Sequence, residues 1–398
     1  MAVPVLATKL FVPLPRPGAI TRPHLVDRLT ASLRDHRKLT LISAPAGFGK
    51  TSLLSEWIAD ATLRNPQLGV AWLSLESSDD DPARFLGYLV AALHQAQPDA
   101  ASADPAPNQP LEAALAALIN DVAASGREIL IVLDDFQLVE NAAIRHAIVF
   151  LLDHLPPTLH LAIASRSDPL LPVARLRARG ELTELRAADL RFTPDEAASF
   201  LNHTMGLGLT AADAAALEAR TEGWIAGLQL AALSLRDQAD AGQFIESFTG
   251  SHRFVIDYLA EEVLQRQPDD VRDFLVRTSV LGRLSGPLCD FVLGRTGSAA
   301  MLEKLERDNL FVVPLDGERA WYRYHHLFDD VLQARLGPEA AQLHRLASEW
   351  CERNDLPDEA VQHALAAGDF DRAAAVIEAA IPAVRKSRHD DAVLRWLS

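Results

Sequence analysis

The sequence predicts an α/β domain with a parallel sheet, followed by a remainder that is mostly helical. Two observations support this fold class. A glycine-containing loop, Ser43 to Thr51, joins an apolar run to an amphipathic run, as a phosphate-binding loop joins a strand to a helix. Residues 129–133 are aliphatic without polar alternation, which is typical of a strand buried on both faces of a parallel sheet. From residue 191 onward the strand signal fades and helical patterns predominate.

The composition narrows the classes of protein that fit. A length of 398 residues exceeds one ordinary core, so about two to four domains are expected. A formal net charge of -16 argues against nucleic-acid backbone binding by this segment, because such affinity comes from basic patches. Cys289 and Cys351 lie far apart without companions at ligand spacing, so neither a disulfide framework nor a zinc site is expected. No apolar run could span a bilayer and no signal-peptide pattern opens the chain, which predicts a cytoplasmic protein without a membrane partner.

Residues 1–38 are predicted to form an arm and a first helix. Prolines keep the arm extended, and Arg22-Pro23 opens a helix through Leu25, Leu29 and Leu33. Two interpretations remain open at this point. The arm either lies over a bound base or is a loose tail with one helix packed on the core.

The loop at Ser43 to Thr51 carries the chemistry of nucleotide binding. Gly47 and Gly49 let the backbone turn its amides inward, and the following helix N-terminus adds partial positive charge. Lys50 would reach the β- and γ-phosphates, and Thr51 would offer its hydroxyl to Mg²⁺. Ala44 replaces the usual first glycine and is small enough for the loop to close. A chance match is the alternative, but the strand before and the helix after favour a real site. The predicted nucleotide-binding residues here are Ala44, Pro45, Ala46, Gly47, Phe48, Gly49, Lys50, Thr51 and Ser52.

A second strand at 70–75 is followed by the acidic cluster Asp79-Asp80-Asp81, with Pro82 opening a helix. Three adjacent carboxylates can form a metal site. We interpret them instead as a solvated helix N-terminus, which the helix dipole favours. The stretch at 100–110, rich in Ala, Pro and Asp, is expected to be a surface loop.

Two further strands end in candidate catalytic residues. The buried strand at 129–133 is followed by Asp134 and Asp135, at the carboxyl end where open α/β sheets bind ligands. Asp134 would hold Mg²⁺, and Asp135 would orient or deprotonate the attacking water. A strand at 159–164 leads to Arg166, which would either sense the γ-phosphate or form a surface ion pair. With a fifth strand at 181–185, these elements form a nucleotide-binding domain at 39–190.

A helical lid domain is predicted at 191–250. The stretch Thr193-Pro194-Asp195-Glu196 is a strong helix start, with an N-cap, a proline at the first position and acids in the first turn. The core helix of this domain would contain residues 222–230, where two glycines four apart permit close backbone approach.

The last two predicted domains occupy 251–336 and 337–398. The first combines helical runs with a hairpin turned by Asp316-Gly317, which suits a winged helix. Because it lacks a concentrated basic helix, an interdomain role is favoured over DNA binding. The second shows Ala-rich helical pairs, which indicate the start of an α-solenoid, TPR-like, that is truncated here or continues further.

Taken together, these landmarks resemble the signal-transduction ATPases with numerous domains (STAND), in particular the bacterial LuxR-type transcription regulators similar to the maltose-regulon activator. The resemblance covers nearly the whole chain. The motifs that carry it are Thr8-Lys9-Leu10, Ile20-Thr21-Arg22, the loop Ser43 to Thr51, Ala71-Trp72-Leu73-Ser74-Leu75, Asp134-Asp135, Ser165-Arg166, Gly223-Trp224, Gly227-Leu228 and Tyr322-Arg323-Tyr324-His325-His326-Leu327-Phe328.

The resemblance implies a lid and a winged helix closed on ADP at rest, a superhelical sensor, and a helix-turn-helix that binds promoters and lies outside this chain. Inducer plus ATP would open the clamp and allow self-association. The resemblance also places Ile20 and Arg22 near the base and Gly227 in the lid motif. His325 corresponds to the histidine that touches the ADP β-phosphate in related switch ATPases. Two departures are His326, which replaces an acid, and Gln229, which replaces a proline.

These expectations combine into one functional hypothesis. The chain would be the ATP/ADP-binding switch of an ATP-dependent transcriptional activator, a weak Mg²⁺-dependent ATPase whose slow hydrolysis resets the active state. Its catalytic residues would be Asp135 and Arg166. The alternative is a constitutive AAA-like ATPase motor or chaperone, which would turn over rapidly without an inducer. A small-molecule kinase is disfavoured, because no arginine-rich acceptor lid is apparent.

Overall fold

The structure is a computed structural model that describes residues 5–14, 18–97, 110–236 and 241–387. The chain divides into two compact units, which are described one at a time. The first comprises Met1–Ala219 with Gly223–Ala241, and the second comprises Arg220–Glu222 with Gly242–Ser398. The surface loop predicted at 100–110 lies, apart from its last residue, outside the described residues.

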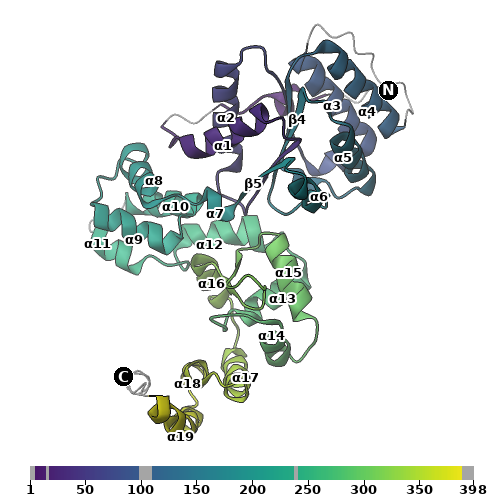
Figure 1. Ribbon diagram of the computed structural model, residues 1–398. Coiled ribbons are helices and arrows are strands. Elements are labelled where there is room, and N and C mark those ends of the chain that lie inside the picture. Colours follow the sequence, from purple (N-terminus) through teal and green to yellow (C-terminus); the bar gives the residue numbers. More distant parts are fainter. Residues whose placement is uncertain (1–4, 15–17, 98–109, 237–240, 388–398) are drawn as a thin grey trace. The chain divides into compact units, whose positions relative to one another are not determined.

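A five-stranded parallel sheet forms the centre of the first unit (Figure 1), with the strand order β2-β3-β4-β1-β5. The strands are β1 (Leu39–Ser43), β2 (Gly69–Ser74), β3 (Ile129–Asp134), β4 (Leu159–Ser165) and β5 (Leu182–Arg186). Every residue of β1, β3 and β4 is buried, as the aliphatic runs predicted. Ser43 at the end of β1 stands opposite Ser165 of β4 and Arg186 of β5, so the loops that follow these strands share one edge of the sheet.

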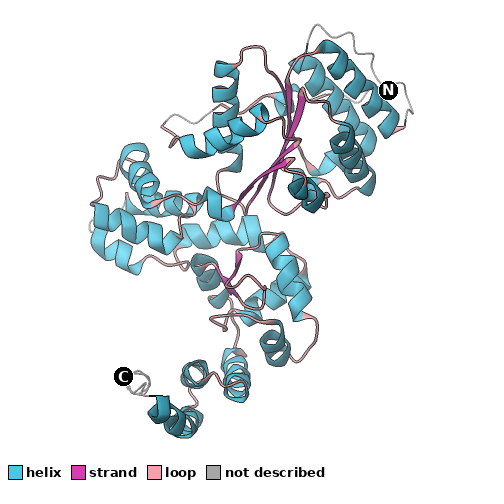
Figure 2. Ribbon diagram, viewed as in Figure 1, coloured by secondary structure: helices cyan, strands magenta, loops and turns pink. Residues whose placement is uncertain are grey.

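Helices cover both faces of this sheet, with α1 and α2 on one face and α3, α4 and α5 on the other (Figure 1). Their bounds are α1 (Pro23–Arg34), α2 (Lys50–Arg64), α3 (Pro82–Ala96), α4 (Leu111–Ser125), α5 (Ala142–His154) and the short α6 (Val173–Ala178). The large core lies between the sheet and α3 to α5, and includes Leu73, Phe85 and Ile148. Figure 2 shows that helix predominates everywhere outside the sheet and one short hairpin. Helices α4 and α5 were not predicted.

The prediction for the acidic cluster is wrong at Asp79, whose side chain is fully buried rather than solvated. Its carboxylate pairs with Lys9 of the 3-10 turn η1 (Ala7–Leu10) and accepts a 2.9 Å hydrogen bond from Arg84. The Lys9 ammonium also lies 4.5 Å from the ring centroid of Tyr88. Asp81 does cap α3 by accepting from the backbone N–H of Arg84. A buried ion pair therefore fastens the arm to the sheet domain.

Helices α7 to α10 complete the first unit, apart from the last two residues of α9, and lie in the region predicted as a lid, the name that we keep for them. They are α7 (Ala187–Leu190), α8 (Pro194–Ser199), the π-helical turn η4 (Phe200–Thr204), α9 (Ala211–Thr221) and α10 (Ile225–Leu235). Thr193 and Glu196 form the expected capping box of α8. The helix predicted across 222–230 begins only at Ile225, because Glu222 and Gly223 adopt left-handed φ values of 49° and 68°. A Cβ atom at Gly223 would lie 2.5 Å from the carbonyl oxygen of Phe192, so this position requires glycine.

The second unit contains helices around a two-stranded antiparallel sheet. Its elements are α11 (Ala241–Ser247), α12 (Arg253–Leu259), the π-helical turn η5 (Ala260–Leu264), α13 (Asp269–Thr278), α14 (Gly286–Leu293), α15 (Ser298–Arg307), β6 (Val312–Pro314), β7 (Tyr322–Tyr324), α16 (His326–Gln333), α17 (Ala340–Arg353), α18 (Pro357–Ala366) and α19 (Phe370–Ser387). The predicted hairpin is confirmed, with Val312 paired to Tyr324. Helix α14 was not predicted.

Helices α17, α18 and α19 pack against one another in chain order. A small core between them includes Cys351, Ala360 and Val376. The TPR-like character of these helices and the predicted domain limits stay predictions. Among the helices that the structure describes, none is both long and apolar enough to cross a membrane.

Candidate nucleotide-binding site

The loop between β1 and α2 turns on two glycines in the left-handed region. Gly47 has a φ of 77° and Gly49 a φ of 76°, which side chains rarely adopt. A Cβ atom at Gly49 would also lie 2.9 Å from Cδ1 of Ile225 in the lid. Ala44 is fully buried and has no positive φ, so alanine fits there without strain and the loop closes.

Lys50, the first residue of α2, lies folded over this loop and is only 8% exposed. Its ammonium donates hydrogen bonds to the carbonyl oxygens of Ala44 at 2.7 Å and Pro45 at 2.8 Å. Burial, followed by the charge of Arg166, lowers the pKa of Lys50 to about 8, against the opposing pull of the nearby aspartates. A poorly solvated cation at a helix N-terminus is well placed to exchange two carbonyl contacts for phosphate oxygens.

Thr51 and Asp134 meet beside Lys50, where the Thr51 hydroxyl donates a 2.8 Å hydrogen bond to Oδ2 of Asp134. Burial, followed by the neighbouring charge of Asp135, raises the pKa of Asp134 to about 6, although the bond from Thr51 opposes this. A hydroxyl and a carboxylate are ligands that Mg²⁺ accepts. In the described part of the chain, no cluster of three or more His, Cys, Asp or Glu side chains could hold a metal by itself. This donor set fits an ion that takes its other ligands from phosphate and water, and Thr51 and Asp134 would hold it.

Asp135 and Arg166 approach each other across the ends of β3 and β4. Nε of Arg166 lies 3.8 Å from Oδ1 of Asp135. The amide of Gln137 lies between the two loops, donating to Oδ1 of Asp135 and accepting from the backbone N–H of Arg166, both at 2.8 Å. Gln137 was not among the predicted site residues. The available signal was a polar residue two positions after the paired acids, in the turn that leaves the strand.

The lid contacts the phosphate-binding loop through backbone carbonyls. The indole Nε1 of Trp224 donates to the carbonyl of Ala46 at 3.0 Å, and the backbone N–H of Ala226 donates to the carbonyl of Gly47 at 3.1 Å. A Cβ atom at Gly227 would lie 2.6 Å from the Trp224 ring, so the predicted lid glycine makes room for the indole. Trp224 is one of the motif residues, but its contact with the loop was not predicted.

A cavity of about 380 Å³ lies beside the loop, between the arm, the first turns of α2 and the lid. Its walls include Ile20, Arg22, Gly49, Ser52, Phe192, Phe200, Met205, Ile225 and Gln229. Apolar walls with a few polar groups suit a nucleotide base. Ile20 and Arg22 of the arm are therefore packed at the candidate site, where a loose tail would make no such contact.

Arg22 forms part of this wall and also ties three segments together. Its guanidinium donates to the carbonyl oxygens of Leu190 and Arg191 at 2.8 Å and pairs with Glu196 at 3.0 Å. Its backbone N–H donates to Oε1 of Glu56 in α2 at 2.9 Å. With these partners, the Arg22 side chain holds the arm on the lid.

His325 belongs to the second unit, whereas the phosphate-binding loop belongs to the first. It is 2% exposed, and its Nε2 donates to the carbonyl oxygen of Thr221 at 3.1 Å. Beside it, Arg323 forms a bidentate pair with Glu222, with both distances at 2.8 Å. The predicted contact of His325 with a phosphate stays a prediction.

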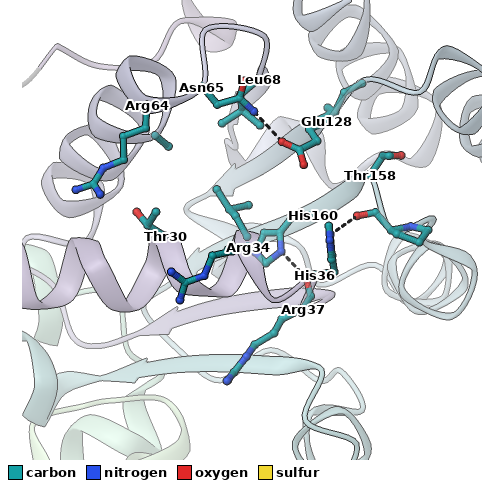
Figure 3. Close-up of a pocket in the computed structure, with 14 residues that line it drawn as sticks. Thr30, Arg34, His36, Arg37, Arg64, Asn65, Leu68, Glu128, Thr158 and His160 are labelled. Atoms are coloured by element: carbon teal, nitrogen blue, oxygen red, sulfur yellow. Dashed lines mark hydrogen bonds between the residues drawn. The ribbon is translucent and has the colours of Figure 1, made fainter.

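A second cavity, of about 250 Å³, lies at the opposite edge of the sheet (Figure 3). Its deepest polar side chain, His160, is bonded through both ring nitrogens, to the carbonyl of Arg37 and the hydroxyl of Thr40. Burial lowers the pKa of His160 to about 4, so the ring is neutral. Asn65 likewise donates to Glu128, as Figure 3 shows. His160 and Asn65 thus have protein partners, and we assign no site here.

The site and the sheet define the class of the chain, a P-loop ATPase segment joined to a winged helix. The fold agrees with the Walker-type ATPase of Pyrococcus abyssi, which aligns at a TM-score of 0.56 and 15% identity over 81% of this chain and 98% of that chain. The MalT winged helix domain matches residues 260–344.

Two longer relatives identify the family. The HTH-type transcriptional regulator MalT of Vibrio cholerae is 36% identical over 380 residues, 92% of this chain and 41% of the relative. The serine/threonine-protein kinase PknK of Mycobacterium tuberculosis is 38% identical over 384 residues, 94% of this chain and 34% of the relative. The chain belongs to the MalT-like STAND ATPases, and it spans less than half the length of these relatives.

Proposed function

We propose that this chain is the ATP/ADP-binding switch of an ATP-dependent regulator, in which slow hydrolysis resets an inducer-controlled, self-associating state. The observation that carries the proposal is the bonding of the lid to the phosphate-binding loop, through Trp224 to Ala46 and through Ala226 to Gly47. A ligand that rearranges the loop therefore acts directly on the lid. A simple hydrolase has no need of this connection, whereas a switch depends on it.

Hydrolysis in this proposal rests on residues at the carboxyl edge of the sheet. Lys50 would bind the phosphates, and Thr51 with Asp134 would hold Mg²⁺, which would neutralise charge that develops on the phosphate oxygens. Asp135 would accept a hydrogen bond from the attacking water, and Arg166 would face the γ-phosphate. The base would occupy the cavity beside Ile20, with Arg22, Gly227 and Gln229 shaping the arm and lid around it.

Transcription control is the proposed output, because the matched winged-helix domain and the Vibrio relative both carry the name MalT. DNA would be bound by a domain other than those described, and an inducer by the helical repeats. A kinase-linked output is the second candidate, favoured by the Mycobacterium relative. Both outputs use the same switch, so the switch is what we assign to these residues.

The test is nucleotide extraction and sizing of the full-length protein, with and without candidate inducers. The proposal expects retained ADP after purification, and larger assemblies with inducer plus a non-hydrolysable ATP analogue. A protein that holds no nucleotide, and whose assembly state ignores ATP under every inducing condition, would contradict the proposal. Steady-state hydrolysis of about one per second or faster without inducer would support a constitutive motor instead.

Promoter binding and protein phosphorylation separate the two outputs. Nucleotide-dependent retention of promoter fragments by the full-length protein supports transcription control. Transfer of the labelled γ-phosphate from ATP to a protein hydroxyl supports the kinase-linked output.

A further inference from the structure

We propose that Gln137 is a positioning residue that orients Asp135 and links it to the backbone of Arg166. The inference rests on the proposed function and adds a regulatory contact to the same site. One side-chain amide joins the turn after β3 to the turn after β4, through two hydrogen bonds of 2.8 Å. Those turns carry the water-orienting carboxylate and the phosphate-facing arginine of the proposed reaction.

The chemistry of the partners fixes the orientation of this amide. The Asp135 carboxylate only accepts hydrogen bonds and the backbone N–H of Arg166 only donates, so Nε2 of Gln137 must face the first and Oε1 the second. A glutamate at this position has no donor for Asp135 and adds a second negative charge. A leucine has neither polar group.

The backbone around Gln137 places its side chain between the turn after β3 and the turn after β4. Asp135 has a left-handed φ of 58°, which ends β3 and starts the 3-10 turn η3 (Phe136–Leu138). Phe136 is 2% exposed and anchors that turn in the core. The N–H of Leu138 closes the turn on the carbonyl of Asp135 at 3.1 Å. A strained residue held by such contacts is a common feature of functional sites.

The consequence is a mechanical link between phosphate sensing and water activation. Gln137 holds Oδ1 of Asp135, and the second oxygen is then oriented to accept a hydrogen bond from the attacking water. When Arg166 shifts toward a γ-phosphate, its backbone N–H shifts with it. The same amide transmits that shift to Asp135, so hydrolysis responds to the state of the nucleotide.

The experiment compares Gln137→Leu and Gln137→Glu in the full-length protein, with ATP affinity and single-turnover hydrolysis measured separately. We expect ATP affinity within about 3-fold of the wild type and hydrolysis slowed by about 10- to 100-fold, as for other small misplacements of a reacting group. Gln67→Leu, in an exposed turn before β2, is the matched control and should leave both quantities unchanged. If Gln137→Leu does not fold, the longer and more flexible Gln137→Met takes its place.

A double-variant cycle separates positioning from general stability. If Gln137 acts through Asp135, then Gln137→Leu should slow hydrolysis no further in an Asp135→Asn background. Unchanged hydrolysis in Gln137→Leu, or losses that multiply in the double variant, would overturn the inference while leaving the proposed switch intact. A wild-type protein that binds no ATP would overturn the proposed function, and the inference with it.

Discussion

The indole nitrogen of Trp224 and the carbonyl oxygen of Ala46 lie 3.0 Å apart, so a lid side chain is bonded to the backbone of the phosphate-binding loop. Trp224→Phe keeps an aromatic ring against Gly227 but removes the donor. We expect the free energy of unfolding to fall by about 1–3 kcal/mol, because a buried carbonyl loses its partner. We also expect faster ADP release, measured with a fluorescent ADP analogue, because only the bond from Ala226 to Gly47 then holds the lid to the loop.

Trp72→Phe is the control for this prediction. Trp72 donates to the hydroxyl of Ser74 at 2.8 Å within β2, away from the lid. This variant should lose a comparable amount of stability and release ADP at the wild-type rate. Identical ADP release from the wild type and Trp224→Phe would show that the lid contact does not control the loop.

Nucleotide affinity should fall as the pH rises through about 8, the pKa of Lys50 in the ligand-free protein. Below that pH the ammonium is charged and meets the phosphates directly. Above it Lys50 is neutral, and binding must take up one proton, so ADP affinity should drop by up to about 10-fold per pH unit until the pKa of the bound state is reached. Calorimetry between pH 7 and 9.5, in buffers of different ionisation enthalpy, measures both the affinity and the proton uptake.

Two variants test whether the Lys50 ammonium causes this pH dependence of nucleotide affinity. Lys50→Arg keeps its charge across the range and should bind with little dependence on pH. Lys50→Ala should lose nucleotide retention altogether, because the loop loses its cation. Undiminished ADP binding by Lys50→Ala would refute the placement of the phosphates.

The affinity for Mg²⁺ should fall at acid pH, because burial and Asp135 raise the pKa of Asp134 to about 6. Above pH 6 the carboxylate is charged and can hold Mg²⁺. As the pH falls through 6 it takes up a proton, and more Mg²⁺ should be needed to reach half-maximal ATP binding. Titrations of Mg²⁺ from pH 5 to 8 measure this shift.

Asparagine variants distinguish the two aspartates at this edge of the sheet. Asp134→Asn should weaken Mg²⁺ dependence, and its Mg²⁺ requirement should no longer rise as the pH falls through 6. Asp135→Asn should preserve ATP binding and slow hydrolysis. Asparagine also tolerates the left-handed φ of 58° at Asp135, so this variant should fold normally. Normal hydrolysis in both variants would remove the end of β3 from the site.

Local patterns in the sequence were enough to predict the strands of the sheet, the glycine-containing loop between β1 and α2, and the position of Asp134 at the carboxyl end of β3. Each of these depends on residue types that are close in the chain, or on the rule that parallel strands end at a shared edge. The contacts that were missed join distant residues. Trp224 and Ala46 are 178 positions apart, and Lys9 and Asp79 are 70 apart. Periodicity describes which face of an element is buried, but it does not say which polar group that face will meet.

The pair of Lys9 and Asp79 provides a test of how firmly the arm is held. Both side chains are at most 4% exposed, and Lys9→Ala would leave the buried carboxylate with Arg84 and the backbone N–H of Glu76 as partners. Losing the more buried of its two cations leaves the Asp79 charge only partly compensated by Arg84, so we expect urea denaturation to show a loss of about 2 kcal/mol in the free energy of unfolding. Since the arm also lines the candidate base cavity, ADP release should quicken.

Lys304→Ala is the matched control, because Lys304 forms a half-exposed pair with Asp308 at 2.7 Å on the surface of α15. Solvent screens such a pair, and its loss should cost less than about 1 kcal/mol. Lys9→Met combined with Asp79→Asn should recover part of the stability lost in Lys9→Ala, since the partly compensated buried charge is gone. Should Lys9→Ala cost no more than Lys304→Ala, the buried pair does not fasten the arm, and the faster ADP release expected from its loss should be absent as well.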